Sequence, residues 1–346
     1  MKNRFIFLPR NLSSAKLITQ IFTKFLMIIG AISGLLVFFA CEKKELPVKP
    51  YERGDAVISQ VEMASDYKYQ VWFSLDKNSV VSSNKKTDWD IAFEASANGF
   101  HIVLNGANAA KVYKTSFSEL TQVIDTLGLG SNGKADMPSG NLDSTAFGDW
   151  QTSNSVFIVN RGYDENGASL GFYKIKIISQ SVTGYTFEYG NVFGFETRQG
   201  SVTKNEEYNF IAYLFNSNSQ RIIEPKKTEY DLCFTQYTYL FYQPSFQYYQ
   251  VTGVLSNSYN TRVATINKAF SGITMNDTAS VKFFTRRDMI GYDWKAFDFD
   301  NNLYTVNKDK IYLICNNKGF YYKLHFVDFY NNSGVKGFPK FEFKKL

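Results

Sequence analysis

The sequence predicts a mainly β protein, made of two tandem antiparallel β units with few short helices. Polar and apolar residues alternate with a period of two in many short segments, as they do in strands that bury one face. Turn-forming runs such as Asn98-Gly99 and Asn332-Ser333-Gly334 separate these segments. A set of sequence markers also occurs twice in the same order, which indicates an internal duplication. Short strands at regular spacing are typical of antiparallel sheets.

The alternation places the elements in chain order. Residues 69–75, 88–93 and 172–177 are predicted strands, rich in aromatic and β-branched residues. The one fair helix candidate covers 116–125, where Ser116 and Glu119 have the spacing of a capping box.

The duplication depends on four markers. Residues 85–93 (KKTDWDIAF) recur as 226–234 (KKTEYDLCF), with five of nine positions identical. The other three markers follow in the same order in both halves: 171–177 and 319–326, 184–189 and 337–343, and the Asp-Trp pairs 149–150 and 293–294. We therefore predict one β unit over 55–195 and a second over 196–346.

The composition and the charge exclude two classes of protein. The 346 residues are 44% hydrophobic and 17% aromatic, whereas disordered chains have low hydrophobicity and few aromatic residues. The formal net charge is +6, yet residues 1–41 alone contain five basic residues and no acidic one. The remaining 33 basic and 32 acidic residues nearly cancel, so we predict no basic patch and no nucleic-acid partner.

Residues 1–41 have the features of an export signal. The uncharged run 25–40 follows a basic segment, and its 16 residues are fewer than the ~20 that a membrane-spanning helix needs. Ala40-Cys41 at its end resembles the lipobox of bacterial lipoproteins, in which the cysteine is diacylated and becomes the mature N-terminus. We predict a lipoprotein signal peptide over 1–41, lipidation of Cys41 and a polar tether over 42–54. An uncleaved signal anchor is the alternative.

The two other cysteines, Cys233 and Cys315, fall within apolar strand-like runs. An oxidising compartment would allow them to pair, but spacing in the sequence does not place their Cα atoms within bridging distance. We predict buried free thiols.

Taken together, these features resemble the HmuY-like lipoprotein family. The resemblance depends on the lipoprotein signal, on Thr87 to Phe93, on Trp294 before the last hairpin, and on the pattern from Tyr322 to Phe343. The resemblance covers both halves of the chain, which would form two tandem HmuY-like units. A typical haem-binding member of the family is expected to have a single unit. The resemblance also implies an outer-membrane lipoprotein of Gram-negative bacteria, which can be exposed at the cell surface and which binds haem or a related tetrapyrrole for iron uptake. The implied partner is an outer-membrane TonB-dependent receptor.

The resemblance further implies two axial haem ligands, which are His in some members and Met in others. His101 and His325 lie in strand-like segments, where a histidine is more often a half-buried structural residue than an iron ligand. Met137, Met275 and Met289 lie in predicted loops, and a thioether can bind haem iron. Met275 and Met289 are the predicted ligands, although methionine is more often a packing residue.

An alternative function is a glycan- or protein-binding surface module without haem. Residues 237–250 contain seven aromatic residues, which can stack on a sugar or a porphyrin. The same residues can serve cross-strand packing, because Tyr237, Tyr239 and Phe241 alternate onto one face.

An enzyme is the least supported class. The G-x-S-x-G run 167–171 falls in a predicted hairpin turn rather than a strand-to-helix turn, and 128–133 (GLGSNG) is not followed by a helix. No coherent set of acid, base and nucleophile is present, so we predict no catalytic residue and no metal site besides haem.

Overall fold

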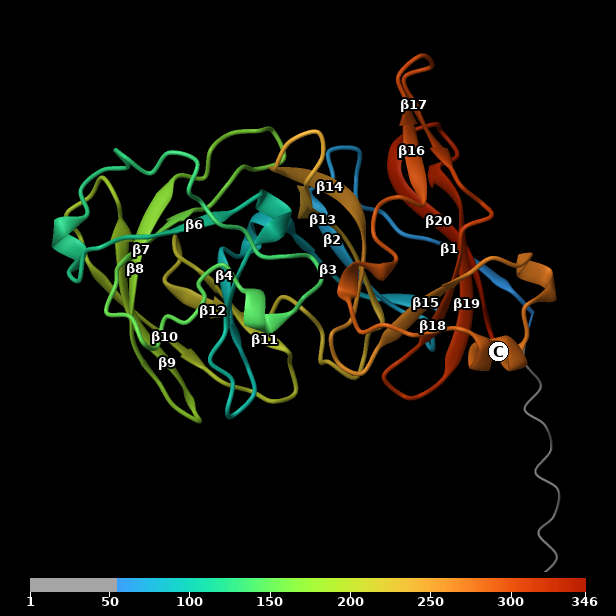
Figure 1. Cartoon of the computed structure of the whole chain (residues 1–346), viewed down its shortest axis with the longest axis horizontal. Coiled ribbons are helices and arrows are strands. Elements are labelled where there is room, and N and C mark those ends of the chain that lie inside the picture. The colour runs from blue at the N-terminus through green and yellow to red at the C-terminus, as the bar shows by residue number, and fades with distance from the viewer. Residues whose placement is uncertain (1–54) are drawn as a thin grey trace, which may run out of the picture. The chain divides into compact units, whose positions relative to one another are not determined.

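The computed structural model describes residues 55–346, which fall within one compact unit of mainly antiparallel β structure (Figure 1). The predicted fold class is confirmed. The predicted signal peptide, the tether and Cys41 lie outside the described residues. Within 55–346, no helix is long and apolar enough to span a membrane.

Four sheets form four successive layers. Outer sheet 1 has the order β10 (Arg198–Thr203), β9 (Gly184–Asn191), β8 (Phe172–Gln180), β7 (Phe157–Asn160), β6 (Lys111–Lys114). Inner sheet 1 has the order β12 (Ser219–Arg221), β11 (Phe210–Leu214), β4 (Ile91–Glu94), β5 (Ile102–Leu104). Inner sheet 2 has the order β14 (Gln247–Ser256), β13 (Leu232–Phe241), β2 (Tyr69–Ser74), β3 (Ser79–Lys85). Outer sheet 2 has the order β1 (Val57–Gln60), β20 (Lys336–Lys345), β19 (Tyr321–Tyr330), β18 (Ile311–Cys315), β15 (Arg262–Ile266).

Each inner sheet packs one face against its outer sheet. Ile91 and Phe93 of β4 enter the core that inner sheet 1 shares with outer sheet 1. Leu232 and Phe234 of β13 enter the equivalent core between inner sheet 2 and outer sheet 2. Because successive side chains of a strand point to opposite faces, the residues between them turn away from these cores. Each inner sheet therefore has a second face that does not pack against its outer sheet.

The two halves of the chain repeat one strand order and exchange their first three strands. Strands β1–β3 of the first half join the sheets of the second half, and β10–β12 join those of the first. The predicted ranges 55–195 and 196–346 therefore differ from the structure as spatial units, because each is completed by strands of the other. Equivalent strands carry similar residue patterns, so the sequence does not show which copy a strand pairs with.

Buried polar residues repeat along with the strands. The side-chain amide of Asn105 donates to the carbonyl oxygens of Lys86 and Trp89, at 2.6 and 2.8 Å. In the second half, Asn257 donates to the equivalent oxygens of Lys227 and Tyr230, at 2.7 and 2.9 Å. Both asparagines are fully buried. These shared contacts are an independent structural sign of the duplication.

Two buried aspartates hold the exchanged strands in place. Asp90 accepts a hydrogen bond from the Phe215 amide, and Asp231 accepts one from the Leu75 amide, at 2.8 and 2.7 Å. Each amide belongs to a hairpin contributed by the other half. Asp90 also pairs with the guanidinium of Arg161 at 2.7 Å. Burial raises the pKa of Asp231 to about 6, and no ion pair is formed by this residue within the described chain.

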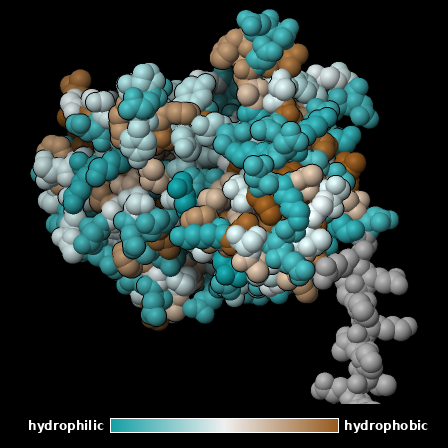
Figure 2. Space-filling model, turned by 45° about the vertical axis from the view of Figure 1, so that its right-hand side comes forward, coloured by the Kyte–Doolittle hydropathy of each residue, from teal (hydrophilic) through white to brown (hydrophobic). Residues whose placement is uncertain are grey.

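A short hairpin has no counterpart in the first half. Strands β16 (Lys295–Asp298) and β17 (Leu303–Val306) pair only with each other. The hairpin projects beyond the sheets in Figure 1 and stands out at the top of Figure 2, where hydrophilic and hydrophobic residues are mixed over the visible face.

The helical content is limited to 3-10 turns among the described residues. They are η2 (Lys86–Asp88), η3 (Gly106–Asn108), η4 (Leu120–Gln122), η5 (Leu142–Ser144), η6 (Phe270–Gly272), η7 (Met275–Ser280) and η8 (Arg287–Met289). The predicted helix over 116–125 is wrong, since only η4 forms there. The Lys174 ammonium donates a hydrogen bond to the carbonyl oxygen of Val123 at 2.6 Å. In a longer helix, a backbone amide of the next turn would donate to this oxygen instead.

Cys233 and Cys315 are buried free thiols, as predicted. Burial raises the pKa of the Cys233 thiol to about 12, so this cysteine is not a reactive thiolate near neutral pH.

Lys295 is a buried amine surrounded by aromatic rings. Its Nζ lies 4.5, 5.5 and 4.9 Å from the ring centres of Trp294, Tyr304 and Phe329, and it donates to the Thr252 carbonyl at 2.5 Å. Burial lowers the pKa of Lys295 to about 7. The charged form is therefore costly inside this protein.

We expect Lys295→Met to increase the free energy of unfolding at pH 6.5 by about 1–4 kcal/mol, because the methionine removes a buried charge. The ordinary lysine pKa of about 10.4 applies to the unfolded chain. Between about pH 7 and 10 the unfolded state binds the extra proton, so wild-type stability rises with pH in this window relative to Lys295→Met. Urea denaturation at pH 6.5 and 9.5 measures this difference, with the exposed Lys308→Met as control. A stability difference that stays constant between the two pH values would contradict the prediction.

Candidate functional site

A cavity of about 1220 Å³ lies between the two inner sheets. Its walls are the faces that alternation turns away from the two cores: Ala92 and Glu94 of β4 on one side, Cys233 and Thr235 of β13 on the other. The loop 136–145 and residues 285–288 complete the lining. The volume exceeds the roughly 300–1,000 Å³ of ordinary small-molecule sites, so it is large enough for a ligand of porphyrin size.

Aromatic side chains line both walls. They are Trp72, Trp89, Tyr208, Phe210, Tyr237, Tyr239, Tyr242 and Tyr259. Flat rings of this kind stack on planar conjugated ligands and bury large apolar areas.

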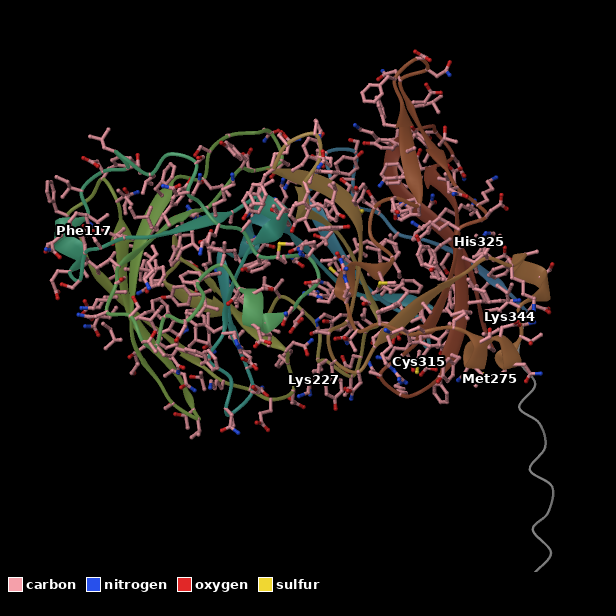
Figure 3. All side chains as sticks on the ribbon, in the orientation of Figure 1. Phe117, Lys227, Met275, Cys315, His325 and Lys344 are labelled. Carbon is pink, nitrogen blue, oxygen red and sulfur yellow. The ribbon has the colours of Figure 1, made fainter. Side chains whose placement is uncertain are left out.

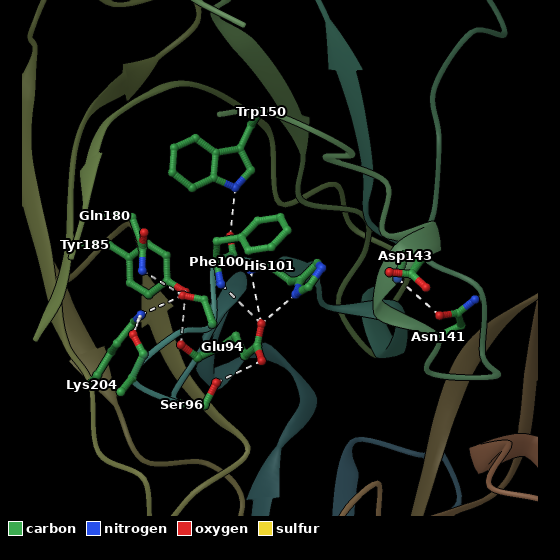
Figure 4. Close-up of polar contacts among 12 residues, drawn as sticks. Glu94, Ser96, Phe100, His101, Asn141, Asp143, Trp150, Gln180, Tyr185 and Lys204 are labelled. Carbon is green, nitrogen blue, oxygen red and sulfur yellow. Dashed lines mark hydrogen bonds and ion pairs between the residues drawn. The ribbon is translucent and has the colours of Figure 1, made fainter. Parts of the chain in front are cut away.

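His101 lies in the cavity lining with one ring nitrogen engaged. Its Nδ1 is 2.5 Å from a carboxylate oxygen of Glu94. An ionised carboxylate only accepts, so Nδ1 carries a proton, and whenever the ring is neutral the lone pair is on Nε2. Nε2 has no partner among the described residues. In Figure 4 a dashed line joins the His101 ring to Glu94, and the loop of Asn141 and Asp143 lies on the other side of the ring.

Glu94 is itself fixed by several donors. Its carboxylate accepts from the Ser96 hydroxyl at 3.0 Å and from the amides of Phe100 and His101 at 3.2 and 3.3 Å. Burial raises the pKa of Glu94, but the hydrogen bonds from His101 and Ser96 outweigh it, so the pKa lies below its usual value. Glu94 is thus an ionised acceptor that orients His101.

The turn before His101 is held by side chains from distant parts of the chain (Figure 4). Four of them donate to two consecutive carbonyl oxygens: Lys204, Gln180 and Tyr185 to Gly99 at 2.6, 3.0 and 2.9 Å, and Trp150 to Phe100 at 2.8 Å. The Phe100 ring also stacks on the imidazole, with ring centres 4.0 Å apart. A side chain mounted in this way is preorganised rather than flexible.

Two further carboxyl groups in the lining have raised pKa values. Asp136 accepts from the amides of Leu104 and Ala146, and burial raises its pKa to about 6. Glu224 accepts from the amides of Asn209 and Phe210, and burial raises its pKa as well. Both groups stabilise loop and strand ends, which is a structural role.

Of the methionine and histidine residues considered as ligands from the sequence, the structure places some in the cavity lining and others outside it. The predicted ligands Met275 and Met289 do not line the cavity: Met275 begins η7, and Met289 packs against the core beneath inner sheet 2. Met137 does line the cavity, as does His101. Figure 3 shows His325 on β19 and Met275 at the short helical turns beside the C-terminal strands.

His325 has both ring nitrogens occupied, unlike His101. Its Nδ1 lies 2.8 Å from the carbonyl oxygen of Lys308, and its Nε2 lies 2.8 Å from Glu342. Its interpretation as a structural residue agrees with these contacts. The same interpretation was given to His101, which the structure places in the cavity lining; the only sequence signal for its contact with Glu94 is the glutamate seven residues earlier across a short turn.

No group of three or more His, Cys, Asp or Glu side chains within residues 55–346 is placed to hold a bare metal ion. His101 and Met137 each contribute a single potential donor atom to the cavity lining.

The family model of the HmuY protein matches residues 66–343, so a single match spans both predicted units. A putative HmuY-like haem-binding protein from Bacteroides vulgatus is 12% identical, with 84% of this chain and 94% of that chain covered and a TM-score of 0.24. Apo PinO from Porphyromonas gingivitis is 9% identical (85% and 98% covered, TM-score 0.29), and the apo HmuY analog of Tannerella forsythia is 10% identical (85% and 98% covered, TM-score 0.24). No curated protein matches this chain.

Proposed function

The chain belongs to the HmuY family, and from this premise we propose that it binds haem or a related tetrapyrrole in the cavity between its two inner sheets. The observation that carries the proposal is His101, whose Nδ1 is held by Glu94 while Nε2 has no partner among the described residues and lies in the cavity lining. Histidines that bind metals nearly always donate their other ring N–H to such an acceptor.

The rest of the lining supports the same ligand. Neutral imidazole is a common haem ligand, and a thioether can supply the second bond from Met137. The aromatic walls suit the two faces of a porphyrin, and no residue set in the lining resembles a nucleophile with its base. Binding and release, rather than catalysis, is therefore the proposed activity.

The proposed setting is iron acquisition at the outer membrane. The basic segment, the apolar run 25–40 and Cys41 support export and lipid anchoring of the chain. We propose that the bound tetrapyrrole passes to an outer-membrane TonB-dependent receptor.

A second candidate function is glycan or protein binding without haem. Tyr242, Phe246 and Tyr249, at and beside the turn between β13 and β14, are each about 60% exposed (63%, 63% and 59%). Exposed aromatic side chains that cluster in this way are typical of recognition surfaces.

A haemin titration of the chain beginning after Cys41 tests the first candidate. We expect a saturable, red-shifted Soret band, with low-spin bands in the oxidised and reduced states. Met137→Ala is expected to weaken or change this spectrum, whereas Met275→Ala and Met289→Ala leave it unchanged because these residues lie outside the cavity. A flat titration at micromolar haemin would refute haem binding and favour the second candidate.

A further inference from the structure

We propose that Lys227 and Arg287 form a carboxylate-binding subsite in the cavity, so that its ligand is a tetrapyrrole with free acidic side chains. This proposal rests on the proposed function and narrows it to a substrate class. It also fixes which end of the cavity receives the acidic edge of the ligand.

Lys227 is a cation of the lining without a carboxylate partner. It precedes β13, and its Nζ lies 4.8 Å from the ring centre of Tyr259, which also lines the cavity. No described carboxylate lies within ion-pair distance of this ammonium. The neighbouring Lys226 differs, because its Nζ pairs with Glu207 at 2.7 Å and it does not line the cavity.

Arg287 is the second such cation. Its Nε donates to the carbonyl oxygen of Ser256 at 3.1 Å, and its backbone amide donates to Ser139 at 3.0 Å. The side chain packs closely beneath Gly140, where an added Cβ would collide with it. Its terminal nitrogens have no partner among the described residues, so part of the guanidinium fork remains available.

The two cations are anchored to adjacent residues. Arg287 binds the carbonyl of Ser256, and the backbone of Lys227 is bound by Asn257, the next residue in the chain. The Lys227 ammonium then lies over Tyr259, two residues further on. Both positive charges are therefore associated with the segment 256–259 at the end of β14.

The acidic residues of the lining do not neutralise this pair by direct contact. Glu94 binds His101, Asp288 binds Arg286, and the carboxyl groups of Asp136 and Glu224 accept backbone amides. Asp143 lies in the exposed turn η5 and forms no ion pair in the described chain. Arg287 attracts the buried Glu224 without direct contact and opposes the rise of its pKa. Neither Lys227 nor Arg287 has a carboxylate within ion-pair distance among the described residues, and two such cations in a partly desolvated cavity favour an anionic ligand.

Carboxylates match both cations chemically. A guanidinium can bind a carboxylate through two parallel N–H bonds, and an ammonium adds a second charge-assisted bond. Haem carries two propionates on one edge, so one edge of the macrocycle would face Lys227 and Arg287. Aromatic side chains elsewhere in the lining then contact the apolar part of the ring.

The test compares haemin with haemin dimethyl ester, which lacks both negative charges, in wild type, Lys227→Met and Arg287→Met. We expect wild type to bind haemin at least about tenfold more tightly than the ester, since a hydrogen bond to a charged group contributes on that scale. Each variant should reduce this ratio by lowering haemin affinity with little effect on ester affinity. Lys226→Met is the matched control and should keep the wild-type ratio.

The outcomes separate the two proposals. Equal affinity of wild type for haemin and its ester would overturn the subsite while haem binding stands. An unchanged ratio in both variants would overturn the assignment to Lys227 and Arg287. Absence of binding for both compounds would overturn the proposed function itself. Lys227→Met serves the comparison even if Arg287→Met does not fold, because Lys227 donates no side-chain hydrogen bond to the described residues.

Discussion

His101→Ala is expected to bind haemin about 100-fold more weakly than wild type and to lose its low-spin absorption bands. Removing a residue that only orients a ligand typically costs 10–100-fold in metal affinity, so loss of the ligand itself belongs at the upper end of that range or beyond. Haemin titration followed by absorbance and by fluorescence quenching measures both changes. The His101 side chain is only 16% exposed and binds Glu94, so urea denaturation is used to show that the variant is folded under the titration conditions.

Glu94→Gln tests the orientation of the ring separately from its presence. An amide can donate as well as accept, so it no longer fixes the proton on Nδ1, and we expect affinity to fall by roughly 10–100-fold. His325→Ala is the matched control, since its ring also binds a glutamate yet lies outside the cavity. Wild-type affinity in His101→Ala, or an equal loss in His325→Ala, would remove His101 as the ligand.

Much of the strand content follows from alternation alone. Residues 69–75 and 172–177 form β2 and β8 nearly as predicted, because their two-residue period can bury a face only as a strand. The repeated segments 85–93 and 226–234 likewise occupy equivalent positions at the starts of β4 and β13. The exchange of β1–β3 with β10–β12 could not be predicted, because either copy offers the same backbone donors and the same apolar face.

The site was harder to predict than the fold. Alternation shows that Glu94 and Ala92 share a face of β4, but it does not show that this face meets a second inner sheet across a cavity. From the sequence alone, the strand-like segment around His101 favours a structural role for this residue, and only the structure places it in the cavity lining. Met137, Met275 and Met289 all lie in loops of similar character, and only the three-dimensional arrangement places Met137 at the cavity.

Asp90→Ala is expected to lower the free energy of unfolding by about 3–5 kcal/mol, the cost of breaking a buried ion pair by removing one partner. The substitution leaves the buried guanidinium of Arg161 without its carboxylate, which lies 2.7 Å away and is itself only 1% exposed. It also removes the acceptor of the Phe215 amide, by which the first half holds a hairpin of the second. Urea denaturation at neutral pH measures the loss.

The equivalent aspartate of the second half supplies the internal control. Asp231 accepts the Leu75 amide in the same way, yet no ion pair is broken when it is removed, so Asp231→Ala should cost only about 1–3 kcal/mol. The double variant Asp90→Asn with Arg161→Met should recover part of the loss, because it leaves no buried charge unpaired. Equal losses for Asp90→Ala and Asp231→Ala would show instead that the hydrogen bond to the exchanged hairpin, common to both halves, is the dominant contribution and that Arg161 adds little.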